Sequence, residues 1–227
     1  SIKNWAPDTE IRYTLDGTEP DTTSKLVEEP ITVGETTTVR ARAFKDGDPV
    51  GYATTETYQK VEPRKAEMES GKDLSQGLKY NYYESPATHR ATYKQHWPLR
   101  RQMDRGNTIE PKKYGTVEKF NLSVREQEEI FGLDFSGYIQ VPESGTYTFY
   151  IQADDDAKLF IGDHQIFDRM GQSPATAYDE ASIVLEKGLH PVSLNYFQAY
   201  GPKELTVMIE GPGVEKQLIS DGMLYHK

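Results

Sequence analysis

The chain contains no cysteine, and this absence removes several kinds of chemistry at once. Disulfide bonds, iron–sulfur clusters, thiolate zinc sites and cysteine nucleophiles are all excluded. No apolar run approaches the about 20 residues that a membrane-spanning helix needs. Positive charge is also scarce, because 26 Lys and Arg face 36 Asp and Glu, giving a formal net charge of −10. We therefore expect neither a nucleic-acid partner, which would need a basic surface, nor insertion into a membrane.

Catalytic motifs are missing as well. The sequence has no Gly-x-Ser-x-Gly, no phosphate-binding loop and no dinucleotide fingerprint. Its five histidines are scattered, without the His-x₃-His or His-Glu-x-x-His spacing of a metal site. The many acidic residues supply numerous carboxylate pairs, so pairs alone cannot identify a glycosidase. We therefore do not expect this chain to be an enzyme in its own right.

Strand patterns are what the sequence does contain. Apolar and polar residues alternate over 11–15 and again over 38–43, which is the period of half-buried strands. Further strands are predicted at 30–33 and 51–58, with turn residues between them. Residues 1–58 are therefore predicted to form a small β-sandwich. A core of this size is marginal, so we expect it to pack against a neighbour.

The rest of the chain divides into a charged segment and a longer β-domain. Residues 59–76 are rich in charge and poor in apolar side chains, which indicates a linker. Within 77–227 the alternation is strongest over 133–141 and 147–153. Further strands are predicted at 78–83, 158–162, 181–186, 191–197 and 204–210, with one helical turn at 125–129. This pattern predicts an antiparallel sandwich or barrel, and hence an all-β protein.

Two motifs in the first domain carry a family resemblance. The run Ile-Arg-Tyr-Thr-Leu-Asp-Gly-Thr-Glu-Pro at 11–20 is followed by Thr-Val-Arg-Ala-Arg-Ala-Phe at 38–44. Together they resemble the C-terminal domain of chitobiases and β-N-acetylhexosaminidases, a small fibronectin-like sandwich. That domain follows the catalytic domain of many bacterial glycoside hydrolases. The resemblance implies a structural spacer with no catalytic residues.

Five segments of the second domain also carry a resemblance: Phe131–Ile139, Val141-Pro142, Gly145–Phe149, Ala153–Ile161 and Gly188–Val192. They resemble the protective-antigen family, whose β-barrel module occurs in glycosidases, flocculins, adhesins and toxins. Many members of the family bind glycans. In these members two adjacent aspartates hold a calcium ion that also contacts sugar hydroxyls. The resemblance therefore implies a glycan-binding module.

The resemblance places the glycan and calcium site on specific residues. The paired aspartates match Asp154 and Asp155, and carboxylate oxygens are ligands that calcium prefers. Gln198 stands where flocculin-like members have an asparagine, and it supplies the same amide oxygen on a longer side chain. Tyr200 is expected at a loop tip beside Gln198, where its ring could stack on a sugar. The alternative for the two aspartates is an ordinary solvated turn, and Asp156 is interpreted as a turn residue.

Two other features have competing interpretations. Tyr138, Tyr196 and Trp97 could also stack on sugars, although core packing is the better explanation for each of them. Seven basic residues lie between 90 and 113: Arg90, Lys94, Arg100, Arg101, Arg105, Lys112 and Lys113. They could dock an acidic catalytic domain or an anionic glycan, or form a solvated loop.

Taken together, the sequence predicts the non-catalytic part of a secreted bacterial glycoside hydrolase, most simply a β-N-acetylhexosaminidase by family analogy. We expect a longer parent chain with a catalytic domain, and an extracytoplasmic location in the periplasm, at the cell surface or outside the cell. The region would hold glycan substrate near that catalytic domain. The principal alternative is a purely structural spacer that buttresses the catalytic domain. An adhesin that binds cell-surface glycans is a further possibility.

Overall fold

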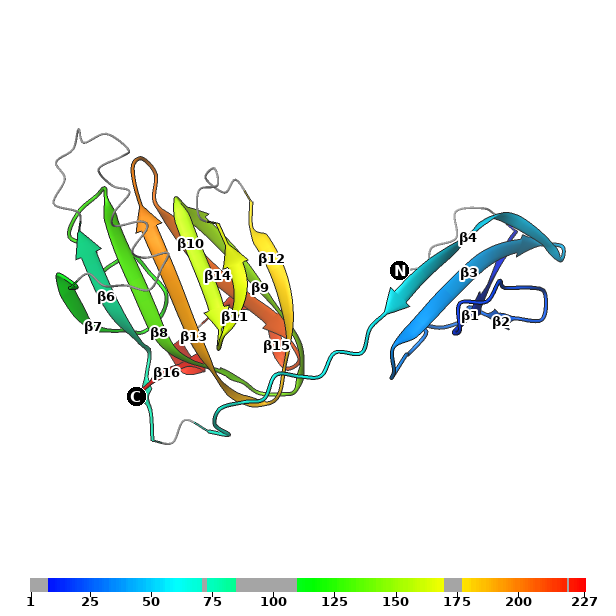
Figure 1. Cartoon of the computed structure of the whole chain (residues 1–227), viewed down its shortest axis with the longest axis horizontal. Helices are drawn as coiled ribbons and strands as arrows, with labels where there is room; N and C mark the ends of the chain where they lie inside the picture. The colour runs from blue at the N-terminus through cyan, green and yellow to red at the C-terminus, as the bar shows by residue number, and fades with distance from the viewer. Residues whose placement is uncertain (1–7, 71–72, 85–109, 170–176, 220) are drawn as a thin grey trace. The chain divides into compact units, whose positions relative to one another are not determined.

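The fold is described from a computed structural model for residues 8–70, 73–84, 110–169, 177–219 and 221–227 (Figure 1). The chain separates into two compact units, Ser1–Glu62 and Pro63–Lys227, called unit 1 and unit 2 below. The described residues form strands and a single short 3₁₀ helix, which confirms the predicted all-β class. No helix in these ranges is long and apolar enough to cross a membrane.

The described residues of unit 1 form one antiparallel sheet of four strands in the order β2-β1-β3-β4. The strands are β1 (Glu10–Thr14), β2 (Lys25–Leu26), β3 (Thr37–Lys45) and β4 (Asp48–Tyr58). The β3–β4 hairpin turns at Asp46 and Gly47, whose φ angles of 51° and 87° are those that a tight two-residue hairpin turn requires. The predicted strand at 30–33 does not form, because no neighbouring strand pairs with this segment.

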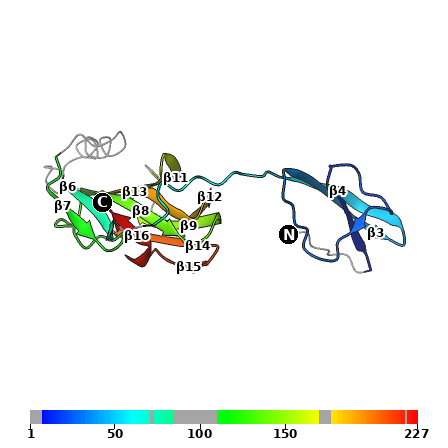
Figure 2. The same cartoon turned by 90° about the horizontal axis from the view of Figure 1, so that it is seen from below.

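Unit 2 is a sandwich of two sheets that face each other across the core (Figure 2). The larger sheet has the order β11-β10-β13-β8-β16-β5, with β6 and β7 continuing from β8. Its strands are β5 (Ser75–Gln76), β6 (Leu78–Glu84), β7 (Lys113–Val117), β8 (Phe131–Val141), β10 (Asp156–Ile161), β11 (His164–Asp168), β13 (Gly188–Gln198) and β16 (Leu224–His226). The smaller sheet has the order β12-β9-β14-β15. It comprises β9 (Gly145–Asp154), β12 (Asp179–Leu185), β14 (Glu204–Gly211) and β15 (Val214–Leu218), and the 3₁₀ helix is Asp221–Met223.

The alternation seen in the sequence explains how the sandwich closes. Along β9, Tyr147, Phe149, Ile151 and Ala153 are fully buried, while the residues between them face outward or lie at the margin. β8 follows the same pattern from Leu133 to Val141. The inward side chains of both sheets form one continuous core. The module is therefore a sandwich rather than a closed barrel.

Part of the predicted linker packs on unit 2. The Arg64 backbone N–H donates to the Val184 carbonyl at 2.8 Å, and the Leu189 N–H donates to the Met68 carbonyl at 2.7 Å. Residues 64–68 therefore run along β12 and β13, whereas the sequence suggested a free connector. Two of the charged side chains also contact unit 2, because Arg64 pairs with Asp163 and Glu67 accepts a hydrogen bond from the Tyr138 hydroxyl. The region predicted as a helical turn, 125–129, consists of bends instead.

Candidate functional site

Two chain crossings lie side by side at one end of the sandwich. β9 belongs to the smaller sheet and β10 to the larger one, and the connection between these two strands is a single residue, Asp155. The loop from Gln198 to Glu204 makes the reverse crossing between β13 and β14. Strand pairing sets Glu204 opposite Asp154, and it sets Phe197 opposite Asp156. The predicted aspartates and the predicted 198–200 segment are therefore brought together, and we call this region the two-aspartate site.

Asp154 is the buried carboxylate of this site. Its side chain is 7% exposed, and its Oδ1 atom is buried without a hydrogen-bond partner. Burial raises the pKa of the Asp154 carboxyl group, and the neighbouring charge of Asp155 and a hydrogen bond between the two carboxyl groups raise it further. The positive charge of Lys203 acts in the opposite direction. A buried acceptor without a donor indicates a place that a cation or a hydroxyl group would satisfy.

Asp155 fixes the facing loop. Its Oδ2 atom accepts a hydrogen bond from the Ala199 N–H at 2.6 Å and another from the Tyr200 N–H at 3.3 Å. The peptide bond between Asp154 and Asp155 is cis. One carboxylate oxygen of Asp155 therefore orients the 199–200 backbone. The side chain is half-buried, so the site has access to solvent on this side.

Gln198 lies beneath the site, and its amide points into the protein. The residue is fully buried, its Oε1 atom accepts from the Tyr196 hydroxyl at 2.7 Å, and its Nε2 donates to the Pro202 carbonyl at 3.0 Å. The same Tyr196 hydroxyl is directed at the Asp154 carbonyl oxygen. Because a hydroxyl has one hydrogen, the two acceptors share it. In this arrangement Gln198 and Tyr196 connect the 199–203 loop to the backbone of Asp154, and Gln198 exposes no oxygen at the surface.

The carboxylates of Asp154 and Asp155 are better placed to bind a hard cation than the Gln198 amide, which is hydrogen-bonded inside the protein. Asp154 offers an unpaired carboxylate oxygen beside a second carboxylate, which is the oxygen chemistry that calcium takes. Among the described residues, no group of three or more His, Cys, Asp or Glu side chains is clustered for metal binding. Any bound ion would therefore draw its remaining ligands from backbone carbonyls, water or a ligand's hydroxyls.

The aromatic candidates separate according to exposure. Tyr200 is 38% exposed at the loop tip, whereas Tyr196 is fully buried in the core. The Tyr138 hydroxyl donates to Glu67 at 3.0 Å, and the Lys227 ammonium lies 5.3 Å from its ring centroid. Tyr200 is thus the aromatic ring best placed to contact a ligand at the two-aspartate site. Trp97 lies outside the described residues.

Asp156 and the basic segment have other surroundings. Asp156 is the first residue of β10 and is buried, rather than part of an exposed turn. Of the basic candidates only Lys112 and Lys113 lie in the described residues, and the other five lie outside them. Lys112 pairs with Glu84 at 2.5 Å and with Glu126 at 3.2 Å, and Lys113 pairs with Glu126 at 3.3 Å. These two lysines therefore already have acidic partners.

A salt bridge that the sequence does not predict lies beside the two-aspartate site. The Lys203 ammonium pairs with Glu128 at 3.0 Å, and it donates to the Gly201 carbonyl at 3.3 Å. These contacts join the site loop to the segment that precedes β8. Lys203 and Glu128 are 75 positions apart in the sequence, and they meet because β8 and β13 are neighbouring strands. No local sequence pattern could therefore predict this contact.

Comparison with protein families matches the PA14 domain to residues 74–222, which is more than half of the chain. The chain belongs to the PA14 domain family. Residues 1–55 match the chitobiase/β-hexosaminidase C-terminal domain. The PA14 domain is thus the part of unit 2 that carries the two-aspartate site. No sequence among the curated proteins matches the chain significantly.

Solved structures share the fold of this PA14 domain at low sequence identity. The Epithelial Adhesin 9 A domain of Candida glabrata, in complex with Galβ1-3GlcNAc, is 17% identical with a TM-score of 0.54, covering 73% of this chain and 96% of that one. The PA14 domain of the MpAFP antifreeze protein is 17% identical with a TM-score of 0.50, covering 67% and 92%. An anti-sigma factor domain-containing protein from Clostridium clariflavum is 21% identical with a TM-score of 0.52, and the match spans 83% of this chain but only 60% of that one.

Proposed function

We propose that the PA14 domain binds a glycan at the two-aspartate site, with calcium held between Asp154 and Asp155. The buried, unpaired Oδ1 of Asp154 beside a second carboxylate carries this proposal. A bound calcium ion would neutralise the two carboxylates and accept sugar hydroxyls as further ligands. Two structures of similar fold, the adhesin domains with Galβ1-3GlcNAc and with β-lactose, contain bound sugars, which supports a sugar-binding role.

The residues around the ion would have distinct tasks. Asp154 supplies the buried charge, and Asp155 supplies charge while its other oxygen holds the 199–200 backbone. Gln198 and Tyr196 hold the start of the 199–203 loop next to the Asp154 backbone. Tyr200 presents an exposed ring beside the ion, where the C–H face of a sugar could pack.

We infer a structural role for unit 1. Among its described residues, the buried hydrophobic side chains are only Val39, Ala41 and Phe44, which is a small core for an independent domain. Its match to the chitobiase/β-hexosaminidase C-terminal domain supports a spacer beside a glycoside hydrolase catalytic domain. The whole region would then be a non-catalytic accessory part of an extracytoplasmic glycosidase of the β-N-acetylhexosaminidase type, and would hold substrate locally at high concentration.

Glycan-array binding of the purified chain, with millimolar calcium and with chelator, tests the proposal. Terbium luminescence measures ion binding independently of any sugar. We expect calcium-dependent glycan binding that is lost in Asp154→Asn and Asp155→Ala, and retained in Asp163→Asn. Asp163 is a matched control, because it is an exposed carboxylate at the far end of β10 that pairs with Arg64. Absence of both ion and glycan binding would overturn the proposal in favour of a purely structural spacer.

A further inference from the structure

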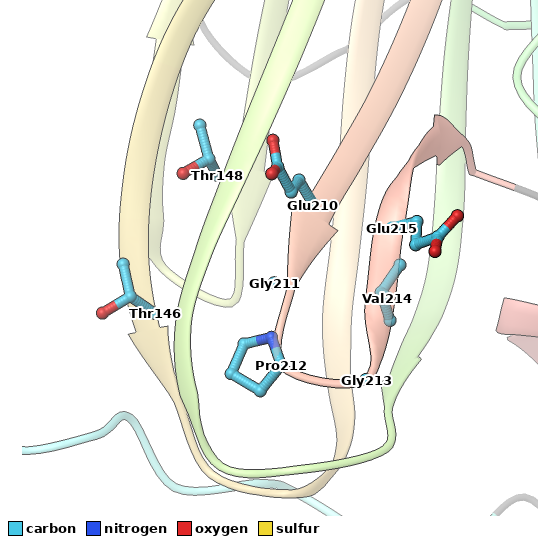
Figure 3. Close-up of a pocket in the computed structure, with 8 residues that line it drawn as sticks. All are labelled: Thr146, Thr148, Glu210, Gly211, Pro212, Gly213, Val214 and Glu215. Carbon is cyan, nitrogen blue, oxygen red and sulfur yellow. The ribbon is translucent and has the colours of Figure 1, made fainter.

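A hollow lies on the outer side of the smaller sheet, away from the two-aspartate site. It has a volume of about 760 Å³ and is bordered by Thr146 and Thr148 of β9, Glu210 of β14 and the turn 211–213 (Figure 3). We call it the hairpin groove. Thr148 and Thr146 lie six and eight residues from Asp154 on the same strand, so the groove lies about 20–27 Å from that site at the rise of a β-strand.

The turn that borders the groove is held in a fixed position. The Tyr147 hydroxyl is directed at the carbonyl oxygens of Glu143 and Pro212, at 2.8 and 2.9 Å. The Tyr147 ring occupies the space where a side chain on residue 211 would be, because a Cβ on Gly211 would lie 2.3 Å from the ring. The groove wall is therefore set by core packing before any ligand arrives, which lowers the entropic cost of binding.

Two polar side chains of the groove, Thr148 and Glu210, belong to a polar row that continues onto the neighbouring strand β12. Strand register places Ser182, Thr148 and Glu210 next to one another on β12, β9 and β14. The Thr148 and Ser182 hydroxyls are hydrogen-bonded at 2.9 Å, and the Tyr150 hydroxyl donates to Glu210 Oε2 at 2.9 Å. Tyr150 thereby orients the carboxylate, while the other Glu210 oxygen retains its capacity to accept hydrogen bonds.

We propose that the hairpin groove is a second glycan-binding site, selective for uncharged oligosaccharides and independent of calcium. Hydroxyl groups and a fixed carboxylate provide donors and acceptors for sugar hydroxyls, and the ring of Pro212 provides apolar surface for sugar C–H groups. The carboxylates of Glu210 and Glu215 disfavour uronic, sulfated or sialylated sugars through like-charge repulsion. The volume lies within the range of about 300–1,000 Å³ typical of small-molecule sites.

A site here would change what the PA14 domain can do with a polymer. Two weak sites about 20–27 Å apart along β9 could bind the same glycan chain, and avidity would then exceed the affinity of either site. The proposal does not require the two-aspartate site to bind sugar, because no residue is shared between the two.

Backbone NMR of the whole chain in chelator tests the groove alone. The probes are cellotetraose, mannotetraose and N-acetylchitotetraose at millimolar concentration, with tetragalacturonate as the anionic comparison. We expect at least one neutral probe to shift the amide signals of Thr148, Gly211 and Gly213, and tetragalacturonate to leave them unchanged. The same titration in Asp154→Asn should be unaltered, which separates this proposal from the calcium site.

Two variants and one control test which side chain is responsible. Glu210→Gln should weaken binding of the responding probe about tenfold, because a hydrogen bond to a charged acceptor is replaced by a neutral one. Thr148→Val, which keeps the shape, should weaken it by several-fold. Asp163→Asn is the control: it also removes a carboxylate charge, but it lies in the turn between β10 and β11 of the larger sheet, outside the groove, so affinity should be unchanged. Shifts from none of the three neutral probes, equal shifts with tetragalacturonate, or equal loss in Asp163→Asn would each overturn the proposal.

Discussion

Replacing Asp154 by asparagine should stabilise the metal-free PA14 domain, although a buried polar contact is usually costly to change. The wild-type side chain is 7% exposed, with one oxygen unpartnered and a second carboxylate beside it. Asparagine keeps the shape, removes the charge and can donate its amide hydrogen to Asp155. A hydrogen bond to a charged group contributes about 1.5–3 kcal/mol, so we expect a gain of that order.

Calcium should reverse the order of stability. At a calcium concentration of about 1,000 times Kd, an ion that binds only the folded state stabilises it by about 4.1 kcal/mol, which exceeds the gain expected for the variant. Wild type would receive this stabilisation and Asp154→Asn would not. Urea unfolding of the whole chain, followed by the amide signals of β9 and β13, measures both states. Asp163→Asn is the control, and it should change neither the stability in chelator nor the response to calcium.

The pH dependence provides a third readout of the same side chain. Because burial and then the charge of Asp155 raise the pKa of Asp154 in the folded protein, the folded state binds this proton more tightly than the unfolded state does. The stability contribution of Asp154 is therefore present below the unfolded pKa of about 3.9, and it is lost as pH rises through the higher folded value. Without metal, the difference between Asp154→Asn and wild type should widen on going from acid to neutral pH. A variant less stable than wild type in chelator at neutral pH would refute the reasoning.

Two further substitutions test the packing that supports the two binding regions. Tyr196→Phe leaves the Gln198 amide oxygen without its donor in the core and should cost about 1–3 kcal/mol in urea unfolding; an unchanged midpoint would mean that the hydroxyl does not hold the loop. Gly211→Ala should cost about 1–3 kcal/mol in thermal unfolding because its methyl group would overlap the Tyr147 ring. Gly34→Ala, where no atom lies within 4 Å of the new methyl group, is its control, and an equal loss in both would contradict the packing argument.

The strands of unit 2 could be predicted well because their alternation is unambiguous. From Tyr147 to Ala153 every second residue is buried, and from Leu133 to Val141 the same holds except at the half-buried Gly137. The segment 30–33 has β-branched residues but no strand to pair with, so it stays irregular. Local propensity does not tell whether a pairing partner exists, and this is where the prediction for unit 1 was wrong.

The site could be located from sequence more readily than its side chains could be oriented. The adjacency of Asp154 and Asp155 to the 198–200 loop follows from two crossings between the same sheets. The direction of Gln198 depends on Tyr196, which alternation places two residues earlier on the same strand face. A family pattern aligns residue types, but only three-dimensional packing decides whether an amide faces the solvent or the interior. The roles of all four predicted residues in calcium and glycan binding stay predictions.

The first and last strands of unit 2 pair with each other. Tyr225 of β16 lies opposite Gln76 of β5, although about 150 residues separate them in the chain. The ends of the sandwich are therefore joined to each other by a strand pair, while the preceding residues 64–68 add backbone hydrogen bonds along β12 and β13. A module closed by its own first and last strands does not depend on its neighbours to hold its ends in place. The PA14 domain of this chain should accordingly be transferable to another protein as residues 63–227, whereas a version that begins at residue 75 would lose the hydrogen bonds of residues 64–68.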